Sequence, residues 1–155
     1  NNGHYQMAQL LIDACSDVNA SDKDGNTALI LASVYGYTEI VKFLIDNGAD
    51  VNAADRNRWT ALMWASRNGH TEIAKLLIDK NNADVNYSRY SCGDTALILA
   101  SKHGRTEIVK LLIDNGADLN AVDECRNTAL MKASEYGHIE IAKLLIEAIE
   151  AGAEA

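Results

Sequence analysis

The chain has 155 residues, of which 48% are hydrophobic and only 6% aromatic; it contains no proline, and its formal net charge is -8 at pH 7. This composition allows a core of aliphatic side chains, and the negative charge argues against nucleic acid or an anionic membrane as the main partner. No apolar run approaches the roughly 20 residues that span a membrane, and no signal segment begins at Asn1. We therefore expect a cytoplasmic protein, or a protein of the host cytosol if it is a secreted effector.

The N-terminal residues 1–26 predict only the second half of a structural unit. Residues 2–4 correspond to residues 68–70, and residues 7–13 correspond to residues 73–79. We interpret this part as a partial first repeat, in a chain that was trimmed or whose preceding residues are absent.

A pattern that begins Thr-Ala-Leu then recurs along the chain. It starts at Thr27, Thr60, Thr95 and Thr128, so the copies lie 33, 35 and 33 residues apart. A fixed period in this range is typical of a solenoid, in which each unit packs only on its neighbours. We therefore predict one repeat domain over residues 1–155, with a partial repeat at 1–26, full repeats at 27–59, 60–94 and 95–127, and a C-terminal capping repeat at 128–155.

Each full unit predicts two helices. In the first unit Thr27 is a candidate N-cap, and the small and apolar residues 28–33 favour a short helix. Gly36 ends this helix, because glycine takes a left-handed conformation without steric cost. A second, amphipathic helix follows, with apolar side chains of residues 40–45 on one face. The equivalent caps in the other units are Thr60, Thr95 and Thr128, and the equivalent glycines are Gly69, Gly104 and Gly137.

The segments between units predict extended, finger-like hairpin turns. The second helix ends at Gly48 and Gly116 in two units and near Asn82 in the unit between them, since asparagine is the next-best residue for a left-handed position. Each segment then begins with an apolar residue and an asparagine and turns at a pair that contains glycine or arginine. We name these segments fingers 1 to 4, at residues 17–26, 50–59, 84–94 and 118–127.

Two residues depart from the repeat at the position that Leu31 and Leu99 occupy in other copies. We interpret Trp64 as a core residue whose indole N–H needs a partner, and Lys132 as polar capping of the last unit. After Ile146 the D-N-G-A-D turn is missing, so we expect the last helix to run on and the stack to end there.

The pattern T-A-L-x-x-A-S…G-x-T-E-I-V-K-L-L-I-D-N-G-A-D-V-N-A-x-D resembles the ankyrin repeat, in four copies that cover essentially the whole chain. The resemblance implies an all-α solenoid of stacked antiparallel helix pairs with projecting β-hairpin-like fingers. It also implies that the finger tips and the concave face of the first helices bind other proteins. The family's Thr-Pro-Leu-His is Thr-Ala-Leu followed by Ile or Met here, so a pre-organising proline and a hydrogen-bonding histidine are lost and packing must contribute more of the stability.

No residue pattern points to catalysis, a metal or a cofactor. His4, His70 and His138 follow the helix-ending glycine and match the family's structural Gly-His pair, whereas His103 precedes its glycine and is a surface candidate. There is no His-x-x-x-His or Cys-x-x-Cys pair and no glycine-rich phosphate loop, so we predict that the protein is not an enzyme. The cysteines match neither a zinc motif nor a disulfide framework, which predicts free thiols at Cys15, Cys92 and Cys125.

Positions that differ between the copies indicate where a partner binds, because the fold explains the positions that are filled alike. They lie in the fingers and at the ends of the first helices, and they are rich in Trp, Tyr and Arg, the residue types enriched at interface hot spots. We predict a monomer that binds an acidic or mixed protein surface. The predicted partner-binding residues, centred on Trp59, Arg67, Arg89 and Tyr90, are Tyr35, Arg56, Arg58, Trp59, Arg67, Asn68, Arg89, Tyr90, Lys102, His103, Glu124 and Tyr136.

Three alternatives to an independent binding module stay open. The repeats can belong to a larger multidomain protein or effector, which the partial first repeat favours and the altered tail disfavours. They can form a purely structural or engineered repeat protein without a natural partner, which the diversity of the fingers argues against. An enzyme is the third alternative, and no set of residues with catalytic roles supports it.

Overall fold

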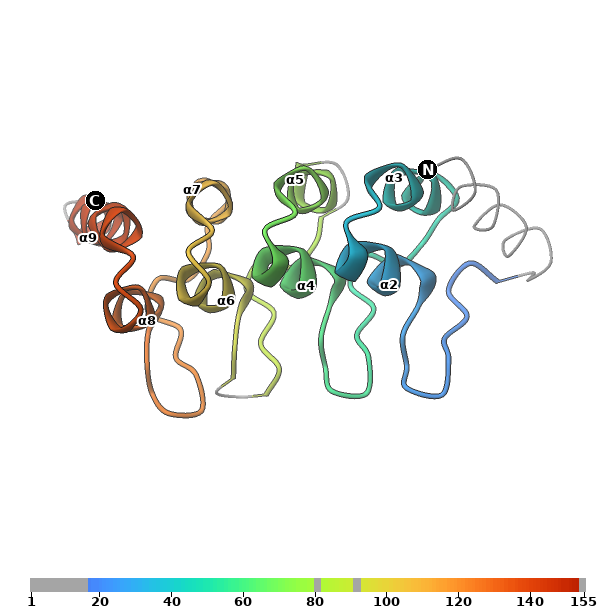
Figure 1. Cartoon of the computed structure of the whole chain (residues 1–155), viewed down its shortest axis with the longest axis horizontal. Helices are drawn as coiled ribbons and strands as arrows, with labels where there is room; N and C mark the ends of the chain where they lie inside the picture. The colour runs from blue at the N-terminus through green and yellow to red at the C-terminus, as the bar shows by residue number, and fades with distance from the viewer. Residues whose placement is uncertain (1–16, 80–81, 91–92, 154–155) are drawn as a thin grey trace.

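The structure is a computed structural model that describes residues 17–79, 82–90 and 93–153, and Figure 1 shows them as a row of helix pairs. The first helix of each pair is α2 (Ala28–Tyr35), α4 (Ala61–Asn68), α6 (Ala96–Lys102) or α8 (Ala129–Glu135). The second is α3 (Thr38–Asp46), α5 (Thr71–Asp79), α7 (Thr106–Asp114) or α9 (Ile139–Ala153). The predicted all-α class is confirmed: the described residues form no strand, and two isolated β-bridges, Ser21 with Thr27 and Ala54 with Thr60, close the roots of fingers 1 and 2.

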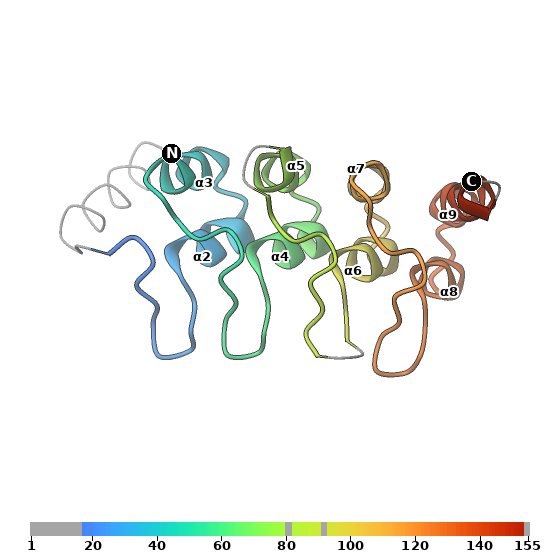
Figure 2. The same ribbon diagram turned by 180° about the vertical axis from the view of Figure 1, so that it is seen from behind.

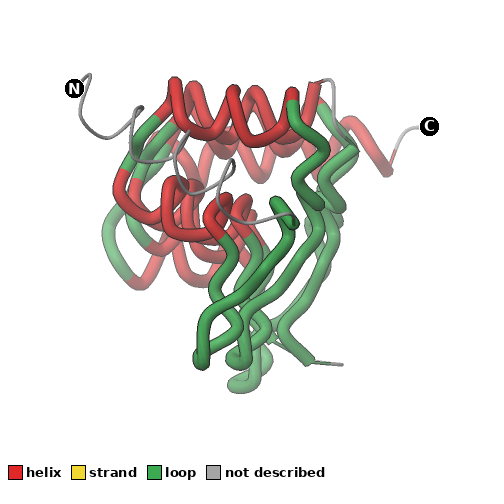
Figure 3. Tube along the Cα trace, turned by 90° about the vertical axis from the view of Figure 1, so that its right-hand side faces the viewer, coloured by secondary structure: helices red, strands yellow, loops and turns green. Residues whose placement is uncertain are grey.

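The helices form two layers, and the fingers extend from one side of them. In Figures 1 and 2 the short helices α2, α4, α6 and α8 form one row, and α3, α5, α7 and α9 form the second. Figure 3 looks along the stack and shows the fingers leaving the helices at a steep angle. The short helices pack on each other more extensively than the second helices do, so the stack bends towards them. We call the short helices and the finger sides next to them the concave face.

Threonine caps and left-handed residues bound the helices as predicted. Oγ1 of Thr27 accepts a hydrogen bond from the backbone N–H three residues later at 3.3 Å. Gly36 and Gly69 end α2 and α4 with φ angles of 78° and 84°, and Asn82, which replaces a glycine, has a φ of 52°. The capping bond recurs with the same length at Thr60, Thr95 and Thr128.

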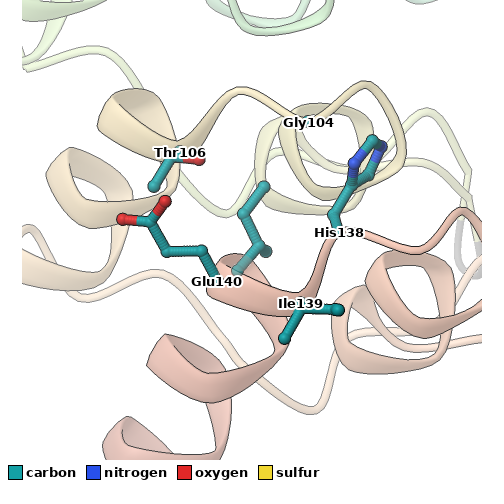
Figure 4. A pocket seen from close by; sticks show the side chains of 6 residues that line it. Gly104, Thr106, His138, Ile139 and Glu140 are labelled. Atoms are coloured by element: carbon teal, nitrogen blue, oxygen red, sulfur yellow. The ribbon is translucent and has the colours of Figure 1, made fainter.

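Histidines that follow the helix-ending glycines connect neighbouring repeats. Nε2 of His70 lies 3.2 Å from the carbonyl oxygen of Val34, and Nε2 of His138 lies 3.1 Å from that of Lys102. Figure 4 shows His138 beside Gly104, where an added Cβ would come within 2.7 Å of the imidazole ring. The predicted structural role of these two histidines is therefore confirmed, and the glycine is needed for space as well as for its φ angle.

Arg105 makes the same connection in the third full repeat, where it stands in place of histidine after Gly104. Its Nε donates a hydrogen bond to the carbonyl oxygen of Arg67 at 3.1 Å. The imidazole of His70 and the guanidinium of Arg105 can therefore both supply an N–H donor at this position. The third predicted structural histidine, His4, lies outside the described residues.

Asparagines at the start of the fingers form a second set of connections between repeats. Oδ1 of Asn52 accepts a hydrogen bond from the N–H of Asp84 at 2.8 Å, and its Nδ2 donates to the carbonyl oxygen of Asn82 at 3.3 Å. Asn19 and Asn86 make the same pair of bonds to the repeats that follow them. We call these three residues the asparagine ladder, and it fixes the root of each finger relative to the next.

The core runs through all the described helix pairs between the two layers. Its large, fully buried side chains include Leu29, Ile30, Leu44, Leu62, Met63, Ile73, Leu77, Leu97, Ile98, Ile108, Leu112 and Ile141. Burial depends on position in the stack: Met63 is 1% exposed, whereas Met131 at the same place in the last described pair is 54% exposed. As predicted from the missing turn, α9 continues for 15 residues, whereas α3 has 9.

Candidate protein-binding surface

The concave face carries a group of four aromatic and three arginine side chains. Finger 2 contributes Arg58 and Trp59, α4 contributes Trp64 and Arg67, and finger 3 contributes Tyr87, Arg89 and Tyr90. We call these seven residues the aromatic–arginine cluster. It brings together the four residues at the predicted centre of the binding surface, namely Trp59, Arg67, Arg89 and Tyr90.

The two tryptophans form the inner part of the cluster. Their ring centroids are 4.4 Å apart and their planes are inclined by 30°. The guanidinium groups of Arg67 and Arg89 lie over the Trp59 ring, 5.8 and 5.4 Å from its centroid. A cation over an indole face is attracted by the negative charge of the ring's π-system, so each contact stabilises the arrangement.

The positions of both tryptophans differ from the sequence-based interpretation. The pattern places Trp59 on the partner-binding surface and Trp64 in the core, but both side chains are half-buried and their rings lie against each other. Nε1 of Trp64 is inaccessible to solvent and has no hydrogen-bond partner among the described residues. Trp64 therefore belongs to the surface cluster, and Trp59 presents only part of its ring.

A buried carboxylate fixes the turn that carries Arg58 and Trp59. Asp55 is only 8% exposed, and its Oδ1 accepts hydrogen bonds from the N–H groups of Asn57 and Trp59, both at 2.8 Å. The carbonyl oxygen of Asp55 accepts a further bond from the N–H of Arg58, whose φ angle is 62°. The tip of finger 2 is thus held by local hydrogen bonds, which gives Trp59 a defined direction towards α4.

Arg89 connects finger 3 to finger 2. Between fingers 1 and 2, the backbone N–H of Arg56 donates to the carbonyl oxygen of Asp24 at 3.0 Å. One repeat later, Nε of Arg89 donates to the carbonyl oxygen of Asn57 at 3.2 Å, and its guanidinium lies 3.6 Å from the Asp94 carboxylate. The side chain of Arg89 therefore replaces a backbone donor, so this residue has a structural role within the cluster.

Arg58 forms the outer end of the cluster with two tyrosines. Its guanidinium carbon lies 5.9 Å from the centroid of the Tyr87 ring and 5.8 Å from that of Tyr90. Arg89 lies 6.0 Å from the Tyr90 ring on the way to Trp59. Tyr90 is 51% exposed, so this end of the cluster is open to solvent.

Other predicted residues lie outside the cluster. Tyr35 is 65% exposed and stacks on Tyr37 with ring centroids 5.9 Å apart. The Lys102 ammonium group lies 5.8 Å over the ring of Tyr136, which is 49% exposed. Nδ2 of Asn68 donates to the same carbonyl oxygen that faces His70, so Asn68 serves mainly to connect repeats. Arg56 is exposed at the tip of finger 2, and Glu124 is exposed in finger 4.

The pKa of His103 reflects the positive charge beside the cluster. Burial lowers the pKa of His103 below its ordinary value, and the positive charges of Arg67, Lys102 and Arg105 lower it further against the opposing effect of Asp94. The imidazole is therefore held in its neutral form at neutral pH. The electrostatic surroundings of this residue are positive, although the whole chain is acidic.

Lys132 does not act as an outward cap. Its Nζ lies 3.5 Å from the Asp123 carboxylate in finger 4 and 3.0 Å from that of Glu135. Burial alone would raise the pKa of Asp123, but hydrogen bonds from Asn127 and Cys125 and the Lys132 charge together lower it. Lys132 instead lines a pocket between fingers 3 and 4 together with Arg89, Asp94, Lys102, Asp123, Glu124 and Cys125.

Neither metal-binding nor membrane-spanning features occur in the part of the chain that the structure describes. No three His, Cys, Asp or Glu side chains gather there in a way that would hold a metal ion. None of the helices described combines the length and apolar character needed to cross a membrane. Cys125 is a free, exposed thiol, while Cys15 and Cys92 lie outside the described residues.

Comparison with known protein families agrees with this architecture. A family model described as ankyrin repeats (3 copies) matches residues 1–89 and again residues 83–155. The chain belongs to the ankyrin repeat family. No curated protein matches the chain as a whole or in part. Ankyrin repeats generally mediate protein–protein interactions, so the aromatic–arginine cluster lies in a fold that is suited to binding a protein.

The ankyrin pattern also explains why Tyr87 is absent from the predicted surface. Tyr87 follows the ladder asparagine at a place that looks like part of the constant finger root. One sequence feature could have identified Tyr87: it is a large aromatic residue where the other fingers have a small one, at Ala20, Ala53 and Ala121. Trp64 was assigned to the core for a related reason, because Leu31 and Leu99 occupy its place in other repeats.

Proposed function

We propose that this ankyrin domain is a non-catalytic protein-recognition module that binds its partner through the finger tips and the concave face. The observation that supports the proposal most directly is the aromatic–arginine cluster in the middle of that face. Trp, Tyr and Arg are the residue types that contribute most to binding at protein interfaces, and they do so when gathered at the centre of the contact. Three arginines in one cluster favour an acidic or mixed partner surface.

The fixed backbone that carries the cluster also supports the proposed binding function. The cluster is built on helix ends and on fingers whose backbone is fixed by hydrogen bonds. A preorganised surface loses little conformational entropy on binding, so more of the contact free energy appears as affinity. Flanking exposed rings at Tyr35 and Tyr136 extend the proposed surface along the stack to both sides. We expect the module to act as a monomer in the cytoplasm.

The proposal is tested by measuring the affinity for a partner recovered by affinity capture from lysate. Trp59→Ala removes the ring on which two guanidinium groups rest, so we expect the binding free energy to weaken by about 2 kcal/mol, or roughly 30-fold in Kd. The measurement is isothermal titration calorimetry of the purified pair, with circular dichroism to confirm that the variant is folded.

Ile139→Ala is the control for this measurement. Ile139 is 70% exposed at the start of α9 and makes no part of the proposed surface, so its replacement removes exposed apolar area without touching the cluster. Its Kd is expected to stay within about twofold of the original value. A folded Trp59→Ala protein that binds as tightly as the original chain would refute the proposed surface.

A further inference from the structure

The three arginines of the cluster differ in whether their N–H donors are already used. Nε of Arg89 is bonded to the Asn57 carbonyl oxygen, and its guanidinium faces the Asp94 carboxylate. Arg58 and Arg67, in contrast, form no side-chain hydrogen bond and no ion pair within the described part of the chain. The cluster therefore contains one arginine with a structural role and two whose side-chain donors have no partner among the described residues.

Aromatic rings hold both of these free arginines in place. Arg58 lies over Tyr87 and Tyr90, and the guanidinium of Arg67 lies 5.8 Å from the Trp59 centroid and 5.5 Å from that of Trp64. A contact with a ring uses none of the N–H donors of a guanidinium group in a conventional hydrogen bond, so these donors stay available to a ligand. A planar fork of donors matches a carboxylate, which it binds through two parallel hydrogen bonds.

The two free arginines lie at opposite ends of the cluster. They share no ring: Arg58 contacts only the tyrosines of finger 3, Arg67 contacts only the tryptophans, and Arg89 connects the two groups through Tyr90 and Trp59. In an extended chain, alternate side chains point the same way about 7 Å apart, so acidic groups two or more residues apart can reach separate anchors.

Local charge favours the same kind of ligand. Arg67 lies close enough to His103, together with Lys102 and Arg105, for the three positive charges to lower the pKa of the imidazole. This positive region stands on a chain whose net charge is -8. A short segment with a few carboxylates meets mainly the positive region, whereas a long polyanion would also meet the acidic remainder of the surface.

We propose that the cluster binds an extended acidic segment of the partner, with one carboxylate on Arg58, a second on Arg67, and apolar contacts to Trp59 and Tyr90 between them. This inference rests on the proposed function and specifies the chemistry of the partner. A single-stranded nucleic acid is disfavoured, because such ligands stack bases on open aromatic faces. The Trp59 ring is already contacted by Trp64, Arg67 and Arg89.

The test is a selection of random 12-residue peptides displayed on phage against the complete chain. We expect the enriched peptides to contain at least twice the Asp and Glu content of the starting library, with two acidic residues in most sequences. Synthetic copies of three such peptides are then titrated by fluorescence polarisation. Arg58→Gln with Arg67→Gln should weaken their binding at least tenfold, because both bidentate sites are lost while the side chains keep similar length.

A matched double variant controls for net charge. Lys23→Gln with Arg126→Gln also removes two positive charges from finger tips, and Arg126 has a φ of 64°, like that of Arg58. Neither Lys23 nor Arg126 contacts an aromatic ring among the described residues, so this variant should change peptide affinity less than threefold. Replacing Glu by Gln in the peptides should reproduce the loss, and a (dT)12 oligonucleotide should bind more weakly than the peptides.

The possible results separate this inference from the proposed function. Enriched peptides without an excess of acidic residues, equal losses in the two double variants, tighter binding of the oligonucleotide, or no enrichment at all would each overturn the acidic-segment inference. If the captured protein partner then still depends on Trp59 but not on Arg58 and Arg67, the proposed protein-binding function stands alone. If it depends on neither set of residues, the proposed surface fails as well.

Discussion

At the scale of single residues, the repeats keep a hydrogen bond while changing the group that makes it. The carbonyl oxygen at the end of a short helix faces His70 in one repeat and Arg105 in the next. A finger carbonyl accepts from the backbone N–H of Arg56 in one place and from the side chain of Arg89 in the next. These hydrogen bonds connect neighbouring repeats, and each is expected to contribute about 0.5–1.5 kcal/mol to stability.

Backbone conformation at the finger tips leads to a prediction about stability. Arg126 has a φ of 64° where finger 1 has Gly25 with a φ of 83°, and a left-handed conformation costs a residue with a Cβ about 1–2 kcal/mol. Replacing Arg126 by glycine would relieve this strain, but the greater conformational freedom of glycine in the unfolded chain offsets part of the stabilisation. We expect Arg126→Gly to raise the free energy of unfolding by about 0.5–1 kcal/mol in urea denaturation followed by circular dichroism.

The converse substitution serves as its control. A Cβ at Gly25 would lie 2.8 Å from the backbone nitrogen of Arg56, in addition to the unfavourable φ angle. Gly25→Ala should therefore lower the free energy of unfolding by more than about 1 kcal/mol. If Arg126→Gly left stability unchanged or reduced it, strain at this position would not explain the glycine in finger 1.

At the scale of elements, the fingers keep their shape without the ladder of a β-sheet. The tips of fingers 2 and 4 are organised around Asp55 and Asp123, which are buried carboxylates that accept backbone N–H bonds across the turn. The finger roots are fixed by the asparagine ladder. Fingers 2 and 4 are thus held at both ends, which is how a segment without regular strands can present Arg58 and Trp59 in a defined place.

The asparagine ladder gives a prediction with an internal control. Asn52→Ala removes one donor and one acceptor that bond to the next repeat, so we expect the free energy of unfolding to fall by about 1–2 kcal/mol. Asn120 is the equivalent residue of finger 4, and within the described part only its backbone N–H is hydrogen bonded. Asn120→Ala should cost less than about 0.5 kcal/mol, and equal losses in the two variants would argue against the ladder as a source of stability.

At the scale of the whole molecule, the burial of a residue at a given repeat position depends on where its repeat lies in the stack. Small residues on the short helices allow close packing on the concave side, and the two layers enclose one continuous aliphatic core. Each repeat buries its apolar side chains only against its neighbours. The same residue type at the same repeat position is therefore buried in the middle of the stack and exposed in the last described pair, as Met63 and Met131 show.

This difference predicts unequal effects for one substitution made at two equivalent sites. Met63→Ala leaves a cavity in the core and is expected to lower the free energy of unfolding by about 2–4 kcal/mol. Met131→Ala removes a side chain that is already 54% exposed, so we expect a loss below about 1 kcal/mol. Chemical denaturation of both variants measures the two values, and similar losses would contradict the described packing of α8.

The sequence was sufficient for the features that depend on residues close together in the chain. The Thr27 cap, the left-handed glycines such as Gly36 and the amphipathic second helices follow from local rules, and repetition made each of them visible four times. The family and the all-α solenoid follow from the same repetition. Comparison between repeats also identified the variable positions, including most members of the aromatic–arginine cluster.

Only the tertiary structure decided how those variable residues relate to one another. Trp59 and Trp64 pair because the turn around Asp55 brings the end of finger 2 back onto α4, and Arg89 contacts Trp59 from finger 3. The repeat pattern assigns each position by analogy with its copies, but the copies of this one differ: Leu31 is 39% exposed and Leu99 is 3% exposed. The pattern therefore cannot show that a tryptophan in this position packs against another ring. Contacts between side chains from different repeats depend on the distances set by stacking, and local sequence does not encode those distances.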